Sequence, residues 1–346
     1  MRRSVYVCSL HSLILVQFLS FFSLGGVVMT SLNKEFVARQ IKPITTERRD
    51  ADFVALCKKA GEIRGGSTSA VGDRCRVGND VVDFFTFEER LNTRSKYDIH
   101  FYDFLERIEE FKEKKFIRNM LVYYENVKNK NKTKNKYVVM KEVFNICIGA
   151  INIFRPLVAM EVYAKYKPTS VLDICAGWGG RCIGAAAMGV PRYTGLEINV
   201  SLREGYFKML QYLMQREEVS TTMHMMFGDA LHVNCDALPK YDMVFTSPPY
   251  YFLEKYSHNS GYKNKKDMNE RFYLPLFRKF YDGLALGGHF IVNVNKDIYG
   301  ACCVPLLGEA DETLPFKKSK RQNEYSEGIY VWRKLGDAKL AKETAV

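Results

Sequence analysis

The stretch VLDICAGWGGR, residues 171–181, decides how the rest of the chain is interpreted. It starts with an apolar run that contains one acidic residue, Asp173, as expected of a buried strand that ends at a ligand. Gly177, Gly179 and Gly180 follow, and glycines let a backbone turn sharply and approach a ligand closely. The pattern predicts a strand, a tight turn and the start of a helix, which is where nucleotide-like cofactors bind in parallel sheets.

From Tyr137 onwards, short apolar runs alternate with helical stretches. The expected strands cover residues 170–174, 192–198, 223–227, 241–245 and 289–294, and the expected helices cover about 181–188, 201–216 and 269–286. Repeated strand–helix–strand units place their strands in parallel. We therefore expect an α/β, Rossmann-like fold with a mainly parallel twisted sheet, whose ligands bind at the carboxyl ends of the strands.

Two further acidic residues are expected at this edge. Glu197 ends the second strand about twenty residues after the glycine turn, from where a carboxylate can hold two ribose hydroxyls. Asp229 follows the third strand in the segment FGDA and either meets a ligand or caps a short helix. The sequence contains no G-x-x-x-x-G-K-[ST] loop for phosphates. Together, the three acids favour a nucleoside ligand over a phosphate ligand.

The segment TSPPYY, residues 246–251, follows the fourth strand and carries the most specific chemistry. An amino group on cytosine or adenine is a poor nucleophile, because its lone pair is delocalised into the ring. A site that uses it must polarise the N–H bonds and orient the nitrogen. The Ser247 hydroxyl and the Pro248 carbonyl can accept these hydrogens, since Pro-Pro stiffens the turn. The Tyr250 ring can stack on the planar base.

At these residues the chain resembles the amino-methyltransferase family that modifies DNA at cytosine N4 or adenine N6, whose hallmark is [D/N/S]-P-P-[Y/F/W]. The resemblance covers about residues 152–333, roughly half of the chain. It implies a class I methyltransferase fold, S-adenosylmethionine as cofactor, and a target base that is flipped out or already unpaired. The catalytic residues that it implies are Ser247, Pro248, Pro249 and Tyr250. The cofactor-binding residues that it implies are Asp173, Ala176, Gly177, Gly179, Glu197 and Asp229.

The resemblance also divides these roles. It assigns Asp173, Gly177 and Gly179 to the methionine part of the cofactor, Glu197 to the ribose and Asp229 to the adenine. A serine that follows a threonine at the start of the motif favours cytosine N4 slightly over adenine N6. The stretch with Phe154, Arg155 and Pro156 either lies against the methionine end of the cofactor or forms a core helix leading into the sheet.

Composition supports a polyanionic partner and a reduced compartment. The 346 residues carry 51 Lys and Arg against 39 Asp and Glu, a formal charge of +12 that favours contact with nucleic acid. The nine cysteines form no C-x-x-C pair, which is typical of an intracellular protein. The six histidines lack metal-ligand spacing, so we expect no metal. DNA is favoured over RNA as partner, and the sequence indicates no oligomeric state.

The sequence predicts five segments. Residues 1–28 are apolar and are a secretory leader, a membrane anchor or an upstream extension before Met29, of which we favour the extension. Residues 29–127 are expected to form a mainly helical domain, with helix-like stretches such as 95–124, and 128–137 a linker rich in lysine and asparagine. Residues 138–335 form the methyltransferase domain, and 336–346 a flexible tail.

No long target-recognition domain follows the catalytic motif, so other segments must grip a nucleic acid. The candidates are the helical domain, the lysine linker and the basic clusters 263–266 and 317–321, each of which is otherwise a solvated surface. Tyr251, Phe252 and Tyr256 either stack neighbouring bases or fill the loop. Two other functions stay open: methylation of RNA or protein glutamine, and a subunit with this fold that binds nucleic acid without catalysis.

Overall fold

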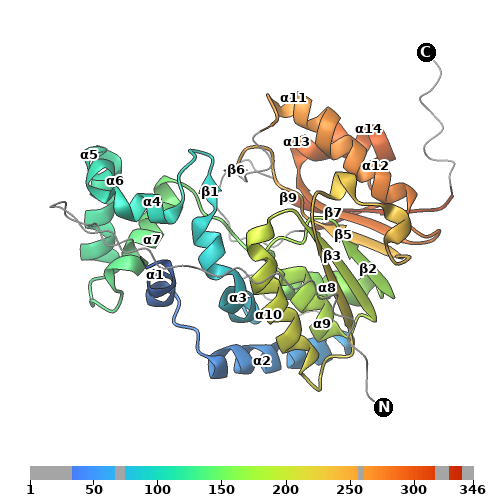
Figure 1. The fold of residues 1–346 in the computed structure, drawn as a ribbon, viewed down its shortest axis with the longest axis horizontal. Coiled ribbons are helices and arrows are strands. Elements are labelled where there is room, and N and C mark those ends of the chain that lie inside the picture. The colour runs from blue at the N-terminus through green and yellow to red at the C-terminus, as the bar shows by residue number, and fades with distance from the viewer. Residues whose placement is uncertain (1–32, 67–74, 256–260, 316–326, 337–346) are drawn as a thin grey trace, which may run out of the picture. The chain divides into compact units, whose positions relative to one another are not determined.

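The computed structural model describes residues 33–66, 75–255, 261–315 and 327–336 (Figure 1). The apolar segment 1–28, the basic cluster 317–321, Tyr256 and all but the first residue of the predicted tail lie outside the described residues. Among the helices that are described, none is long and apolar enough to cross a membrane.

Seven strands of the described residues form one sheet in the order β4-β3-β2-β5-β7-β9-β8. The first five of these run parallel to one another, and β9 is antiparallel to both β7 and β8. The strands are β2 (Ser170–Asp173), β3 (Arg192–Glu197), β4 (Thr222–Phe227), β5 (Met243–Thr246), β7 (His289–Asn295), β8 (Glu312–Pro315) and β9 (Glu327–Arg333). The expected Rossmann-like α/β fold with a mainly parallel sheet is confirmed.

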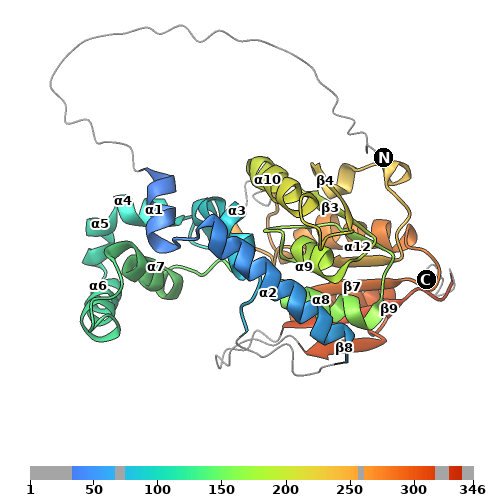
Figure 2. The same cartoon turned by 90° about the horizontal axis from the view of Figure 1, so that it is seen from below.

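Helices cover both faces of the sheet because its strands are apolar on both sides. Val171 faces the core beneath α8 (Pro156–Tyr166), α9 (Gly180–Met188) and α10 (Arg203–Met214). Its neighbour Leu172 faces the second core, beneath α12 (Leu274–Asp282) and α14 (Val304–Leu307). The turn after β2 leads directly into α9, as the sequence predicted. Figure 2 shows α8, α9 and α10 beside the strands.

Short helical turns complete the connections between these elements. Three are 3-10 turns, η2 (Val200–Leu202), η3 (Ala230–His232) and η4 (Cys235–Ala237), and two are π turns, η5 (Asn269–Tyr273) and η6 (Tyr299–Cys303). The remaining two are short α-helices, α11 (Lys265–Met268) and α13 (Lys296–Ile298). The predicted helix over 269–286 thus starts with η5 and continues as α12.

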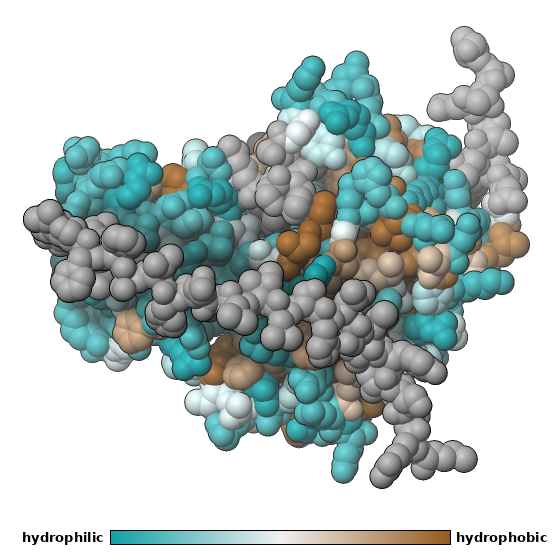
Figure 3. Space-filling view, in the orientation of Figure 1, coloured by the Kyte–Doolittle hydropathy of each residue, from teal (hydrophilic) through white to brown (hydrophobic). Residues whose placement is uncertain are grey.

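The N-terminal part of the described chain is helical. Its elements are α1 (Lys34–Ile41), α2 (Thr46–Arg64), α3 (Asn79–Asn92), α4 (Phe101–Glu106), α5 (Ile108–Glu113), α6 (Lys115–Tyr123), η1 (Tyr124–Lys128) and α7 (Lys136–Cys147). The helix-like region over 95–124 is divided among α4, α5 and α6, and its first residues belong to β1 and a turn. The helix breaks where Arg107 leaves helical dihedral angles and Lys114 becomes extended. In the view of Figure 3 this part presents mainly hydrophilic side chains.

The segment predicted as a linker, 128–137, folds back on itself. The buried side chain of Asn129 donates to the Lys134 carbonyl at 2.8 Å and accepts from the Lys134 amide at 2.9 Å. Asn135 then caps α7, which packs against α1, α4 and α6. The expected boundary at residue 138 falls within α7, so this helix packs with the N-terminal helices, and the division into domains stays a prediction.

A two-stranded antiparallel sheet joins the N-terminal helices to the rest of the chain. Its strands are β1 (Arg94–Ser95), which follows α3, and β6 (Glu254–Lys255), which follows the TSPPYY segment. Ser95 pairs with Glu254 and Arg94 with Lys255. This pairing could not be predicted from the sequence, because a two-residue strand has no detectable period.

Candidate active site

The glycine turn after β2 is closely packed and strained in the way that glycine tolerates. Gly177 and Gly179 have φ values of +59° and +88°, in the left-handed region. A Cβ atom on Gly180 would lie 1.8 Å from the carbonyl oxygen of Phe154. The Ala176 amide donates to the Leu196 carbonyl at 2.9 Å, which ties the turn to the end of β3. The turn is therefore fixed between β3 and the segment before α8.

Glu197 at the end of β3 lies directly against this turn. Its two carboxylate oxygens accept one backbone amide each, from Gly177 at 2.7 Å and from Asn199 at 2.9 Å. Burial raises the pKa of this carboxyl to about 7, although the two amides act in the opposite direction. A buried carboxylate with unused lone pairs beside a glycine turn is suited to accepting hydroxyl hydrogens from a ligand.

Asp173 has internal partners for both of its oxygens. The Arg181 guanidinium donates to them at 2.7 and 3.1 Å, and the Tyr193 hydroxyl donates to Oδ2 at 2.7 Å. The side chain is fully buried. Arg181 also donates to the Cys175 carbonyl at 2.5 Å, so the ion pair braces the glycine turn from below. This geometry therefore disfavours direct contact of Asp173 with a cofactor. Asp173 instead supports the turn through Arg181.

Asp229 behaves as a helix cap in the described structure. Its Oδ1 accepts the Leu231 amide at 2.9 Å, and its Oδ2 lies 2.9 Å from Nδ1 of His232. The adjacent Phe227 pairs with Glu197 in the parallel register of β3 and β4, so Asp229 follows the neighbouring strand at the same edge. Contact with an adenine stays a prediction.

The TSPPYY segment begins beside the glycine turn. The Cys175 amide donates to Oγ1 of Thr246 at 3.0 Å, which joins the end of β5 to the turn after β2. The Pro249 carbonyl accepts the Tyr273 hydroxyl at 2.5 Å, whereas no described residue donates to the Pro248 carbonyl. The Pro248 carbonyl, which we predicted to accept an amino hydrogen, is thus the carbonyl with no hydrogen-bond donor among the described residues.

Tyr250 and Ser247 meet at Asn293, in the middle of β7. The Ser247 hydroxyl donates to Oδ1 of Asn293 at 3.3 Å. The Tyr250 hydroxyl lies 2.9 Å from the same oxygen and 2.5 Å from Oε1 of Glu327. Burial, with the negative charge of Glu327 as a second cause, holds the pKa of Tyr250 well above its usual range. The network holds the tyrosine ring through its hydroxyl, and its face remains the part that a base could use.

Three residues of this edge are not identified by motif. Asn293 is buried and donates through Nδ2 to the Gly328 carbonyl at 3.1 Å. Glu327 comes from the antiparallel strand β9, and Arg181 from α9. Asn293 alone leaves a signal, since it is a polar residue within the apolar run HFIVNV.

The segment before α8 lies against the glycine turn and leads into a buried helix before β2, while contact with the methionine end of a cofactor stays a prediction. The carbonyl of Phe154 faces Gly180, and the Arg181 guanidinium lies 5.0 Å from the centre of the Phe154 ring. Pro156 opens α8, while Arg155 donates to the Cys75 carbonyl at 3.1 Å. Phe154 is therefore at the edge and Arg155 points elsewhere.

The basic cluster 263–266 lies on the other side of the motif. The Lys265 ammonium pairs with Asp297 at 2.7 Å and sits 4.9 Å from the centre of the buried Tyr251 ring. Tyr251 thus fills the loop. Lys266 is 3.9 Å from Glu270 with a largely exposed side chain. In the described part of the chain no cluster of His, Cys, Asp or Glu could hold a metal ion.

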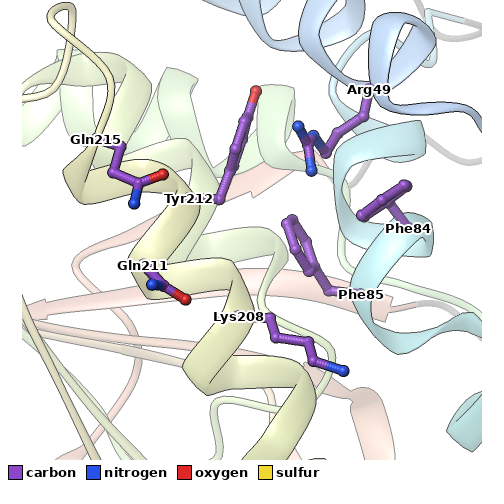
Figure 4. A pocket seen from close by; sticks show the side chains of 7 residues that line it. All are labelled: Arg49, Phe84, Phe85, Lys208, Gln211, Tyr212 and Gln215. Atoms are coloured by element: carbon purple, nitrogen blue, oxygen red, sulfur yellow. The ribbon is translucent and has the colours of Figure 1, made fainter.

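A separate hollow lies between α2, α3 and α10 (Figure 4). It is lined by Arg49, Phe84, Phe85, Lys208, Gln211, Tyr212 and Gln215. The Arg49 guanidinium lies 4.0 Å from the centre of the Tyr212 ring, which connects α2 with α10. None of the predicted site residues lines this hollow.

Comparisons with known proteins found partial similarity, at low sequence identity, to solved structures. No family model and no curated protein matches the chain. TrmN from Thermus thermophilus shares 15% identity at a TM-score of 0.36, over 52% of this chain and 49% of that one. An rRNA methylase from Streptococcus thermophilus shares 11% sequence identity at a TM-score of 0.37, and the similarity covers 54% of this chain and 100% of that one. An RNA methyltransferase from Salinibacter ruber, bound to S-adenosylhomocysteine, shares 13% sequence identity at a TM-score of 0.35, and the similarity covers 53% of this chain and 94% of that one. This chain spans about half the length of the Thermus protein.

Proposed function

We propose that the chain is an S-adenosylmethionine-dependent methyltransferase that methylates an exocyclic amino group of a base in DNA, with cytosine N4 slightly ahead of adenine N6. The observation that carries the proposal is the contact between the two motifs. The hydrogen bond from the Cys175 amide to Thr246 places the glycine turn directly beside the TSPPYY segment. A cofactor on the turn and a base on the motif would then meet at one edge.

The residues of the turn fit the cofactor. Each oxygen of Glu197 accepts one amide and keeps capacity for one ribose hydroxyl. The left-handed Gly177 leaves open space where a side chain would stand, since a Cβ atom there would meet only the Cys175 carbonyl at 3.9 Å, whereas Gly179 packs against Met209. S-adenosylmethionine supplies an electrophilic methyl group on a sulfonium. Asp173 and Arg181 would hold the turn in shape rather than contact the ligand.

The residues of the motif fit the base. The Pro248 carbonyl and the Ser247 hydroxyl can accept the two amino hydrogens, which directs the nitrogen lone pair outwards. The Tyr250 ring, fixed through Asn293 and Glu327, offers a face for stacking. Bound S-adenosylmethionine would supply the methyl group to the nitrogen held by Ser247 and Pro248, and the nitrogen would release one proton to solvent as the new bond forms. Positioning supplies most of the rate enhancement in this scheme.

The test is transfer of labelled methyl groups. The protein starting at Met29 is incubated with S-adenosylmethionine carrying tritium in its methyl group and, separately, with unmodified DNA, RNA and a protein extract. Label in N4-methylcytosine or N6-methyladenine from DNA would support the proposal and name the base. Label only in RNA or protein would overturn the substrate and keep the chemistry. Cofactor binding without label in any arm would indicate a non-catalytic subunit.

A further inference from the structure

A tight turn next to β1 presents two side chains to solvent. The Ser95 amide donates to the Ile99 carbonyl at 3.0 Å, and the Asp98 amide to the Ser95 carbonyl at 2.9 Å. The Ser95 hydroxyl accepts the Tyr97 amide at 3.3 Å. Asp98 adopts a φ of +62°, a conformation that Asp tolerates better than most residues. Lys96 and Tyr97 stand at the tip of this turn.

Arg94 braces the turn with its guanidinium. Its guanidinium donates to the Asp98 carbonyl at 2.7 Å and to a carboxylate oxygen of Asp103 at 3.0 Å. Asp103 in turn accepts the His100 amide at 3.2 Å, in a capping box that starts α4. The backbone of the tip is thus fixed before any partner arrives, which lowers the entropy cost of binding.

The tip carries an exposed aromatic ring and a cation that lies over that ring. Tyr97 is 55% exposed, and the Lys96 ammonium lies 4.8 Å from the centre of its ring. No carboxylate of the described residues forms an ion pair with Lys96, whereas Arg94 pairs with Asp103. A single exposed aromatic residue is common on protein surfaces, so its location must decide whether it matters.

The location ties the turn to both motifs. Ser95 pairs with Glu254 of β6, shortly after Tyr250 and Tyr251 in the chain. Its Cβ also lies 3.3 Å from the position that a Cβ on Gly149 would take, and the chain runs from there to Phe154 at the glycine turn. Tyr97 lies two residues beyond the paired Ser95 and Tyr250 four residues before Glu254, so the two are at most about 26 Å apart, a few nucleotides along a strand.

We propose that Lys96 and Tyr97 hold the unpaired DNA strand next to the target base, by stacking of a neighbouring base on Tyr97 and contact of Lys96 with a phosphate. The inference rests on the proposed function, because that function needs an unpaired base at Tyr250. Stacking on an exposed tyrosine accepts any base, and lysine contacts with phosphate carry no sequence preference. The surface requires no recognition domain after the motif.

The experiment measures binding of a fluorescein-labelled single-stranded DNA oligonucleotide to the full chain by fluorescence anisotropy. Tyr97→Ala should weaken binding about tenfold, and Tyr97→Phe should stay within about twofold, because the ring and not the hydroxyl makes the contact. Lys96→Ala should reduce the slope of log affinity against log salt by about 0.7, the value for one phosphate of a single strand. Affinity for S-adenosylmethionine should remain that of the unchanged protein in all three variants.

The matched control is Phe207→Ala, which removes an aromatic side chain that is 67% exposed on α10. It should leave DNA binding unchanged. Tyr97→Ala binding like the unchanged protein, equal losses in both variants, or no DNA binding by the unchanged protein would overturn the inference. Tighter Tyr97-dependent binding of RNA of the same sequence would overturn DNA as the occupant. Tyr97-dependent DNA binding without methyl transfer would overturn the proposed function and keep the surface.

Discussion

At the glycine turn, charged side chains are buried and paired with one another, whereas at the TSPPYY motif mostly uncharged groups share a network around one hydroxyl. Asp173 and Arg181 are both almost fully buried and bind bidentately. Ser247 and Tyr250 converge on the amide of Asn293, and only Glu327 brings a charge. The buried pair at the glycine turn needs both of its charged partners. The network at the TSPPYY motif consists of weaker hydrogen bonds that orient the side chains of Ser247 and Tyr250.

The difference implies that the two halves fail differently. Loss of a partner in the buried pair leaves an unpaired charge in the core, so folding suffers first. Loss of a member of the hydroxyl network leaves the core intact and misdirects a side chain, so the chemical step suffers first. Each of the following changes separates these two outcomes.

Arg181→Met should have the largest effect. It leaves the Asp173 carboxylate buried without its cation, which costs about 3 to 5 kcal/mol of folding free energy. Urea denaturation followed by circular dichroism measures the loss. Adding Asp173→Asn to this variant should restore part of the stability, because neither charge is then buried alone. A single variant as stable as the unchanged protein would show that the pair does not brace the turn.

Tyr250→Ala should lower methyl transfer about 100-fold while the affinity for S-adenosylmethionine stays within about twofold. The ring that orients the base is removed, and the glycine turn is untouched. Tyr250→Phe, which keeps the ring and removes only the contacts to Asn293 and Glu327, should lose less. Radiolabel transfer and isothermal titration measure the two quantities, and equal loss of both in the alanine variant would refute the separation of the halves.

The smallest expected effect is a pH dependence of cofactor binding, which results from titration of Glu197. Its pKa of about 7 means that the carboxyl holds a proton below pH 7 and loses it above. Ribose hydroxyls donate best to the ionised form, so the affinity should rise about tenfold from pH 6 to pH 8 and then level off. Glu197→Gln should bind weakly at every pH. A pH-independent affinity in the unchanged protein would place the ribose elsewhere.

The sequence predicted the sheet and both motifs because each depends on local patterns. Five strands have clear apolar runs, and the motifs follow two of them directly. The internal partners were out of reach, since Glu327 lies 77 residues from Tyr250 and a motif does not reveal that Arg181 takes up the Asp173 carboxylate. The broken helix over 95–124 also eluded prediction, because its apolar period continues through the breaks at Arg107 and Lys114.

The most direct test of the account is a crystal structure of the chain with S-adenosylhomocysteine. The account predicts both ribose hydroxyls within about 3 Å of the Glu197 carboxylate and the sulfur facing the segment from Ser247 to Tyr250. A ribose away from Glu197, or a sulfur directed away from that segment, would contradict the claim that cofactor and base meet at this edge.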